Sequence, residues 1–387
     1  MNIEGHCDER FRRVRDQFVE NFARRGEIGA AVAVIAGGET VVDLWGGSAH
    51  PDEPMPWTHD TIVMVFSSTK GATALCAHML AARGKLDLDA PVARYWPEFA
   101  AGGKSGIPVR MLLNHQAGLP AIGPKMSEES MFDWRATTEA LARQEPWWPP
   151  GSAHGYHAIT SGFLVGEVVR RVTGRSLGRF FHEEVAVPLG LDFWIGLPQS
   201  EEPRVARLRP APLPTQSTPF FDALADRSTV TNRAFLNPPT LMKPPGVFSR
   251  AARAAEIPAA NGMATARALA GMYAPLACGG TLGGVELVDR DTLERMSRVE
   301  SEGRDRVLCI PTRFASGFMK TMDNRPADSA RLGPNERAFG HVGAGGSIGM
   351  ADPEAGIAIG YAMNAMGLGI LLNERGQSLV NAVYDCL

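Results

Sequence analysis

A serine and a lysine three positions apart are the residues of this chain best suited to nucleophilic chemistry. Residues 67–70 read Ser-Ser-Thr-Lys; they follow an apolar run at residues 62–66, and a stretch of small residues begins at Gly71. If that stretch is helical, Ser67 lies at the helix N-terminus and Lys70 lies on the same face one turn later. A buried lysine with a lowered pKa can take the proton of a serine hydroxyl and make it a nucleophile. The alternative is a serine that caps the helix beside an exposed lysine.

A tyrosine just after a Pro-Gly loop is the second candidate. Residues 149–158 read Pro-Pro-Gly-Ser-Ala-His-Gly-Tyr-His-Ala, and a helix is expected to follow. If Tyr156 lies beside the ammonium of Lys70, the cation lowers the pKa of the phenol by favouring the phenolate. Tyr156 then acts as a general base toward Ser67 and as an acid toward the leaving group. The alternative is a core tyrosine whose hydroxyl has a structural partner.

A glycine-rich segment at residues 339–347, Phe-Gly-His-Val-Gly-Ala-Gly-Gly-Ser, is the third candidate. A strand that ends in glycines lets a substrate approach its backbone closely. The N–H of Ala344, together with that of Ser67, is then placed to form an oxyanion hole. The alternative is a hairpin turn that needs glycine for positive φ.

Residues 345–349, Gly-Gly-Ser-Ile-Gly, match a competing motif, the Gly-x-Ser-x-Gly nucleophile elbow. That motif requires an acid and then a histidine after the serine, and a turn that leads from a strand into a helix. The last of the nine histidines is His341, so none follows Ser347. Ile348 also leads into an expected strand, and both observations argue against the elbow.

Composition indicates a globular protein of 387 residues with a net charge of -3, 44% hydrophobic and 21% charged residues. This balance offers no electrostatic basis for binding nucleic acid or an anionic membrane. The five cysteines are scattered without a Cys-x-x-Cys pair, so neither a disulfide framework nor a zinc site is predicted. With no secretory signal pattern and no membrane-spanning apolar run, we expect a cytoplasmic protein with free thiols.

Hydrophobic periodicity predicts the elements that position these residues. In the N-terminal part we expect an amphipathic helix over 8–25, a β-hairpin over 28–45 that turns at two glycines, a strand over 61–64 and a helix from 67 to 83. Near the C-terminus we expect strands over 314–319, 338–343, 347–351 and 356–363, then a helix over 372–384.

These elements predict an α+β fold in which the hairpin and the C-terminal strands form one antiparallel sheet, with the terminal helices on its face. Residues 1–85 and 258–387 would form this α/β domain, and residues 86–257 a mostly helical insertion domain, with the active site between the two. The proline-rich segment 203–245 is expected to be a long ordered loop, because its aromatic residues need burial.

Taken together, the three motifs resemble, in order and rough spacing, those of the serine β-lactamase/penicillin-binding-protein-like superfamily. Within it, the chain is most similar to the family VIII carboxylesterases, which are class C β-lactamase-like. Supporting similarity lies at residues 112–120, 162–174 and 261–266, and the resemblance extends over about residues 28–387. It implies the β-lactamase/transpeptidase-like fold with its inserted helical domain.

The resemblance also implies roles. Ser67 would be the nucleophile, Lys70 would activate it and tune Tyr156, and Tyr156 would be the proton shuttle. His341 stands where β-lactamases have the lysine of their Lys-Thr-Gly motif, so a fixed positive charge is missing. The usual Tyr-x-Asn is Tyr-His-Ala at residues 156–158. Both departures argue against β-lactam and peptide substrates and favour a neutral ester.

Further residues near these motifs are expected to serve the substrate. His341, Gly343 and Ala344 would form the oxyanion and substrate-binding side. Trp148, beside Trp147, would either line the acyl pocket or wedge the domains together. His157 is expected to line the cleft rather than to bind a metal, because no acidic residue stands at ligand spacing.

We therefore predict a serine hydrolase that cleaves small carboxylic esters through an acyl-enzyme on Ser67, with Tyr156 as the phenolate that takes the proton. The expected partner is a small-molecule ester, and no metal or organic cofactor is implied. Three alternatives stay open: a β-lactamase, peptidase or linear-amide hydrolase on the same site, an acyltransferase to an alcohol, and an inactive sensor on this fold.

Overall fold

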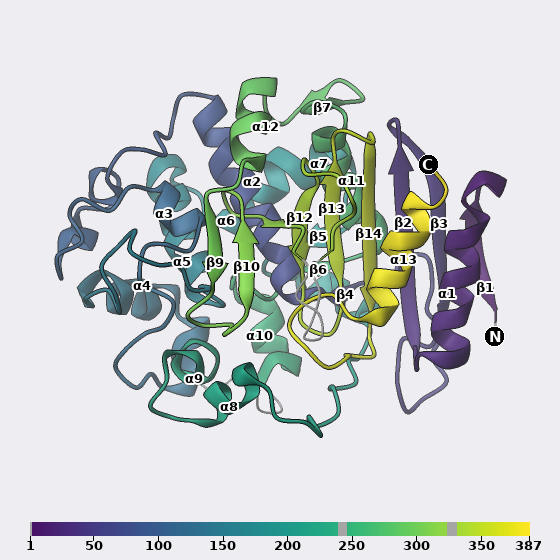
Figure 1. Cartoon of the computed structure of the whole chain (residues 1–387), viewed down its shortest axis with the longest axis horizontal. Helices are drawn as coiled ribbons and strands as arrows, with labels where there is room; N and C mark the ends of the chain where they lie inside the picture. The colour runs from purple at the N-terminus through teal and green to yellow at the C-terminus, as the bar shows by residue number, and fades with distance from the viewer. Residues whose placement is uncertain (1, 239–245, 323–330) are drawn as a thin grey trace.

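The computed structural model describes residues 2–238, 246–322 and 331–387, and its largest feature is a nine-stranded antiparallel sheet (Figure 1). The strand order is β1-β3-β2-β14-β13-β12-β11-β10-β9. Because β14 pairs with β2, the two ends of the chain meet in one sheet. The strands are β1 (Ile3–Cys7), β2 (Gly29–Ala36), β3 (Glu39–Gly47), β9 (Ser301–Arg304), β10 (Pro311–Phe314), β11 (Met319–Lys320), β12 (Phe339–Val342), β13 (Ile348–Asp352) and β14 (Ile357–Met363).

Helices cover both faces of the sheet, and successive side chains of β14 point alternately into the two hydrophobic cores on these faces. Ile357 and Ile359 belong to the core under the terminal helices α1 (Arg12–Arg24) and α13 (Glu374–Tyr384). The small residues Ala358 and Ala362 belong to the core on the other face, where α11 (Ala266–Ala277) packs. A Cβ at Gly360 would clash with the backbone of α11, so a glycine there lets helix and sheet approach closely.

Much of the chain between about residues 85 and 175 lies beyond the β9 end of this sheet (Figure 1). The central helix α2 (Thr69–Ala82) is almost wholly buried. It contacts α5 (Thr160–Thr173), α6 (Leu177–Phe181), α12 (Arg290–Ser297) and strand β12. A small three-stranded sheet consists of β4 (Val63–Met64), β6 (Met263–Ala264) and β5 (Phe193–Trp194), and its strand β4 shortly precedes α2 in the chain. The other α-helices and strands of the described residues are α3 (Arg110–Leu113), α4 (Trp134–Arg143), α7 (Val187–Leu189), α8 (Pro219–Ala225), α9 (Val230–Leu236), α10 (Arg250–Ala254), β7 (Thr281–Leu282) and β8 (Val285–Glu286).

The expected antiparallel sheet with terminal helices on one face is confirmed. The hairpin turns at Gly37 and Gly38, which both have positive φ. The single strand expected over 314–319 is wrong: the chain turns back between β10 and β11, where Gly317 has a φ of 88° and the N–H of Ala315 donates to the carbonyl of Phe318. Strands β1 and β9 were not predicted.

In the proline-rich segment, the described part is an ordered loop that contains the short helices α8 and α9. Phe220 is buried, as expected for an ordered rather than a disordered segment. The remainder of the segment, residues 239–245, lies outside the described residues. Among the helices of the described ranges, none has the length and apolar character needed to cross a bilayer.

Candidate active site

The start of α2 brings Ser67 and Lys70 together. Ser67 lies in a 3-10 turn, Phe66–Ser68, that leads directly into α2. One turn later, the Nζ atom of Lys70 lies 3.1 Å from the Oγ atom of Ser67. Ser67 is partly exposed, whereas Lys70 is buried. Phe66 has a φ of 44°, a left-handed conformation that is rare for a bulky residue and typical of a strained functional turn.

The surroundings of Lys70 favour its neutral amine. Nζ lies 2.7 Å from the carbonyl oxygen of Ala158 and 2.8 Å from that of Ala259. Burial lowers the pKa of Lys70 well below its usual value of 10.5. A neutral amine has two N–H groups, which match the two carbonyls, and one lone pair, which is left to accept the proton of Ser67. The Lys70 amine therefore lies within proton-transfer distance of the Ser67 hydroxyl.

Tyr156 also contacts the Ser67 hydroxyl. Its side chain is hydrogen-bonded to Ser67, and its ring centroid lies 4.7 Å from Nζ of Lys70. Burial raises the pKa of Tyr156 above its usual value, so the expected lowering of this pKa is wrong. The reason is that desolvation disfavours the charged form of both groups. Burial therefore favours the neutral amine and the neutral phenol over the expected ammonium and phenolate.

The backbone of Tyr156 is held by Asp305, a residue the sequence analysis did not single out. Both carboxylate oxygens of Asp305 lie 3.0 Å from the amide nitrogen of Tyr156. Asp305 also accepts hydrogen bonds of 2.8 Å from the N–H groups of Val307 and Leu308. These last two bonds are those of an Asx turn, which the order Asp-Arg-Val-Leu at residues 305–308 is able to form.

His115 holds the backbone of the loop at residues 155–157, which carries Tyr156, through hydrogen bonds. Its Nδ1 atom accepts a hydrogen bond of 3.2 Å from the N–H of His157, and its carbonyl accepts one from the N–H of Gly155. Its ring meets that of Tyr156 edge-on at a centroid distance of 5.0 Å. The backbone of His115 has a φ of 65°, so this support is itself a strained position.

Two further residues that were predicted to serve the substrate, His157 and Trp148, are buried. His157 is fully buried: Nδ1 donates to the carbonyl of Gly155 at 2.7 Å, and Nε2 accepts from the N–H of Leu119 at 3.0 Å. The expectation that His157 lines the cleft is therefore wrong. Trp148 is also buried: its indole donates to the carbonyl of Ala153 at 3.1 Å and lies against the backbone of Gly155.

On the opposite side, β12 and the turn after it approach Ser67. His341 is buried, and its Nδ1 lies 2.8 Å from the carbonyl oxygen of Val342. Burial lowers the pKa of His341 to about 3, so the imidazole is uncharged at neutral pH. Ala344 is partly exposed beyond the buried Gly343. Among the described residues, the N–H groups of Ser67 and Ala344 have no hydrogen-bond acceptor, which leaves both available to an oxyanion.

The competing serine is inaccessible. Ser347 is only 1% exposed, and its Oγ donates to the carbonyl of Val65 at 2.9 Å. Ser347 is followed by strand β13 rather than by a helix. It lacks both the exposure and the local geometry of a nucleophile elbow.

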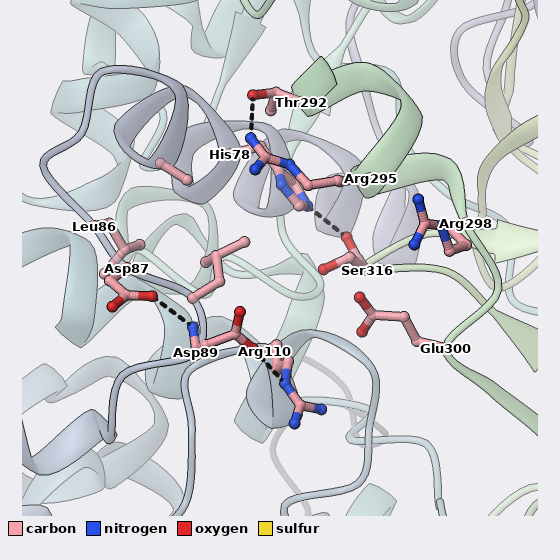
Figure 2. A pocket seen from close by; sticks show the side chains of 12 residues that line it. His78, Leu86, Asp87, Asp89, Arg110, Thr292, Arg295, Arg298, Glu300 and Ser316 are labelled. Atoms are coloured by element: carbon pink, nitrogen blue, oxygen red, sulfur yellow. Dashed lines mark hydrogen bonds and ion pairs between the residues drawn. The ribbon is translucent and has the colours of Figure 1, made fainter. Parts of the chain in front are cut away.

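A separate cavity of about 290 Å³ lies between the C-terminal half of α2 and α12 (Figure 2). It contains neither Ser67 nor Tyr156. Its polar groups largely satisfy one another: Arg110 pairs with Asp89 at 2.7 Å, and Nε2 of His78 lies 2.9 Å from the carbonyl oxygen of Ser316. In the described part of the chain, no group of three or more histidine, cysteine, aspartate or glutamate side chains is arranged to hold a metal ion.

The fold and this Ser-Lys-Tyr arrangement define a serine hydrolase of the β-lactamase/transpeptidase type. The Beta-lactamase family matches residues 12–377, so the chain belongs to that family.

Its relatives include named esterases. It is 38% identical over 370 residues to the esterase/β-lactamase LipL of Mycobacterium tuberculosis, a match that covers 94% of this chain and 83% of LipL. Two solved structures match over the full length of both chains at 41% identity. They are a penicillin-binding protein homolog from Caulobacter crescentus, with a TM-score of 0.90, and a family VIII carboxylesterase, with a TM-score of 0.87.

Proposed function

We propose that this protein is a carboxylesterase that hydrolyses small carboxylic esters through an acyl-enzyme on Ser67. The observation that carries the proposal is the position of the Lys70 amine, 3.1 Å from the Ser67 hydroxyl, with two backbone carbonyls as its other partners. The similarity to a family VIII carboxylesterase and to LipL supports ester substrates.

In the first step, Oγ of Ser67 attacks the ester carbonyl carbon while its proton passes to Nζ of Lys70. The N–H groups of Ser67 and Ala344 stabilise the negative charge that develops on the carbonyl oxygen. The ammonium formed on Lys70 keeps its two carbonyl acceptors and lies near the Tyr156 ring, which attracts a cation. The charge therefore forms where acceptors for it already exist.

In the second step, the carbon–oxygen bond to the alcohol breaks and the alcohol leaves with a proton. Tyr156 donates this proton and regains one from Lys70, because its side chain is hydrogen-bonded to Ser67 and its ring lies beside Nζ of Lys70. A water molecule then attacks the acyl group with Lys70 again as base, which releases the carboxylic acid and restores Ser67.

The charge of the site favours a neutral substrate. His341 is neutral where a β-lactamase lysine would supply a fixed positive charge, and Ala158 has no side-chain amide. β-Lactam hydrolysis on the same residues is a second candidate, supported by the name of LipL, which joins the two activities. Turnover of nitrocefin compared with that of p-nitrophenyl butyrate ranks the two candidates.

Replacing the nucleophile tests the proposal. We expect Ser67→Ala to reduce p-nitrophenyl butyrate hydrolysis to the background rate, because within the described ranges the hydroxyl hydrogen-bonded to Lys70 is that of Ser67. Intact-mass spectrometry of the wild-type protein, quenched during turnover, should show one added acyl group, and peptide mapping should place it on Ser67.

The matched control is Ser297→Ala, since Ser297 is buried in α12 and donates only to backbone carbonyls of its own helix. This variant should retain wild-type activity. Full activity of Ser67→Ala would overturn the proposed function.

A further inference from the structure

Two buried serine hydroxyls link the nucleophile turn to the turn after β12. Ser68 follows Ser67 directly, and Ser347 closes the turn that contains Ala344. Their Oγ atoms lie 3.2 Å apart, and both residues are at most 1% exposed. Neither residue was assigned a role by the motifs, although Ser347 belongs to the Gly-x-Ser-x-Gly match and Ser68 lies inside Ser-x-x-Lys.

Counting protons shows two hydrogen bonds between the two segments. Ser347 Oγ donates to the carbonyl of Val65 at 2.9 Å, which uses its only proton. Ser68 Oγ then donates either to the carbonyl of His341 or to Ser347 Oγ, both at 3.2 Å. In either arrangement, the segment before α2 is connected twice to the ends of the β12–β13 turn. We refer to Ser68 and Ser347 as the hydroxyl bridge.

The two segments are also in close steric contact at the bridge. A Cβ atom at Gly343 would clash with the carbonyl oxygen of Val65 and with Oγ of Ser347. Gly343 is further fixed by its own N–H, which donates to the carbonyl of Ser347 at 2.8 Å. Contact prevents the segments from moving closer, and the hydroxyl bridge prevents them from moving apart.

We propose that Ser68 and Ser347 are positioning residues of the oxyanion hole. The two donors of the oxyanion hole are the N–H groups of Ser67 and Ala344. Ser68 directly follows Ser67, and Ser347 comes three residues after Ala344. The hydroxyl bridge holds the two N–H groups at a fixed separation, which matters most when charge develops on the substrate oxygen. This inference rests on the proposed function.

A double-mutant cycle tests this role. We expect Ser68→Ala and Ser347→Ala each to lower kcat for p-nitrophenyl butyrate by about threefold to tenfold, the scale of one hydrogen bond, with a smaller change in KM. The double variant should lose little more than either single variant, because both hydroxyls belong to one connection. Affinity for an alkyl boronic acid, which forms a tetrahedral adduct with the active serine, should fall in parallel with kcat/KM.

A second pair of variants separates positioning from packing. Ser68→Cys and Ser347→Cys keep nearly the same side-chain volume but replace the hydroxyl with a weak donor. They should therefore lower kcat as the alanine variants do, and they provide the test if the alanine variants fold poorly. Ser297→Ala is again the matched buried serine and should keep both kcat and boronic acid affinity.

The outcomes distinguish this inference from the proposed function. If Ser67 is essential and the bridge variants keep wild-type kcat and boronic acid affinity, with only a lower melting temperature, the hydroxyl bridge is a packing feature and the inference is wrong. If Ser67→Ala is active instead, the proposed function itself fails.

Discussion

In the proposed mechanism, burial rather than a neighbouring charge decides which group at the site acts as the base. Lys70 and Tyr156 both lie in the interior beside Ser67, and a buried group is driven toward its neutral form. The neutral form of lysine accepts a proton, whereas the neutral form of tyrosine donates one. In the proposal, burial therefore makes Lys70 the proton acceptor and Tyr156 the proton donor, although both contact the hydroxyl of Ser67.

The pH dependence of the reaction follows from these directions. The working form of Lys70 is unprotonated, so kcat/KM should rise with pH through the lowered pKa of Lys70 and reach a plateau well below 10.5. The working form of Tyr156 is protonated, and its pKa is raised, so no descending limb should appear before about pH 10. Initial rates with p-nitrophenyl butyrate, corrected for spontaneous hydrolysis, measure the profile.

Lys70→Arg provides the control for this assignment. A guanidinium keeps the positive charge but does not lose its proton in this range, so the variant should be inactive at every pH. An active Lys70→Arg variant with a wild-type pH profile would show that Lys70 supplies only charge and would contradict the assignment of the base.

Sequence alone pointed to Ser67, Lys70 and Tyr156 because each stands at a recognisable position, at a helix start or after a Pro-Gly loop. It did not give the direction of the Tyr156 pKa, since burial depends on segments distant in the chain. Asp305 illustrates the same limit: it binds the N–H of Tyr156 across 149 positions, and no local pattern reveals such a partner. The interior placement of His157 depends likewise on Leu119, from a separate loop.

At the scale of elements, the start of helix α13 is attached to the oxyanion turn. Oδ1 of Asn373 caps α13 by accepting from the N–H of Gly376 at 3.2 Å, and Nδ2 donates to the carbonyl of Gly345 at 2.7 Å. Gly345 follows Ala344, whose N–H is one of the two proposed oxyanion donors. The Asn373 side chain therefore caps the start of α13 and also holds the turn that contains Ala344.

Replacing Asn373 should separate these two functions. Asn373→Asp keeps a good N-cap but loses the donor to Gly345, so its melting temperature should stay close to wild type while kcat falls by about threefold to tenfold. Asn373→Ala should lose kcat and also about 1 kcal/mol of stability. Thermal unfolding and ester kinetics on the same samples provide both measurements.

The matched control is Asp289→Ala, which removes the cap of α12, where Asp289 accepts from the N–H of Thr292 at 2.6 Å. It should cost stability but not kcat. Equal kcat values for Asn373→Asp and the wild type would show that the turn does not depend on Asn373.

Elements were predictable where a local signal marks them. Paired glycines at 37 and 38 marked the hairpin, and helical periodicity marked α1. In contrast, Gly317 divides an apolar stretch into β10 and β11, a turn that hydrophobicity alone conceals. Strand β1 is largely exposed and was missed because it has no buried alternating face and is defined by its pairing with β3.

At the scale of the molecule, the sheet forms only when the C-terminal strand β14 pairs with β2 of the N-terminal hairpin. A buried network joins its ends: Arg375 of α13 pairs with Glu27 at 3.0 Å, and Tyr361 of β14 donates to the same carboxylate. Arg375 also donates to the carbonyl of Ala365, just after β14. The network connects residues 348 positions apart, so it forms only when the sheet closes.

Removing Glu27 should therefore destabilise the whole fold. Glu27→Ala leaves the buried guanidinium of Arg375 without its counter-charge, which costs about 3–5 kcal/mol of the free energy of unfolding. The measurement is denaturant unfolding above pH 7, because burial raises the pKa of Glu27 to about 7 and the pair is ionised above it. Glu374→Ala is the control: its carboxylate is 80% exposed and pairs with Arg25 at the surface, so the loss should stay within about 1 kcal/mol. If the two variants unfold at the same denaturant concentration, the ends of the chain are held by packing of α1 against α13 alone, and the ion pair contributes nothing to closure of the sheet.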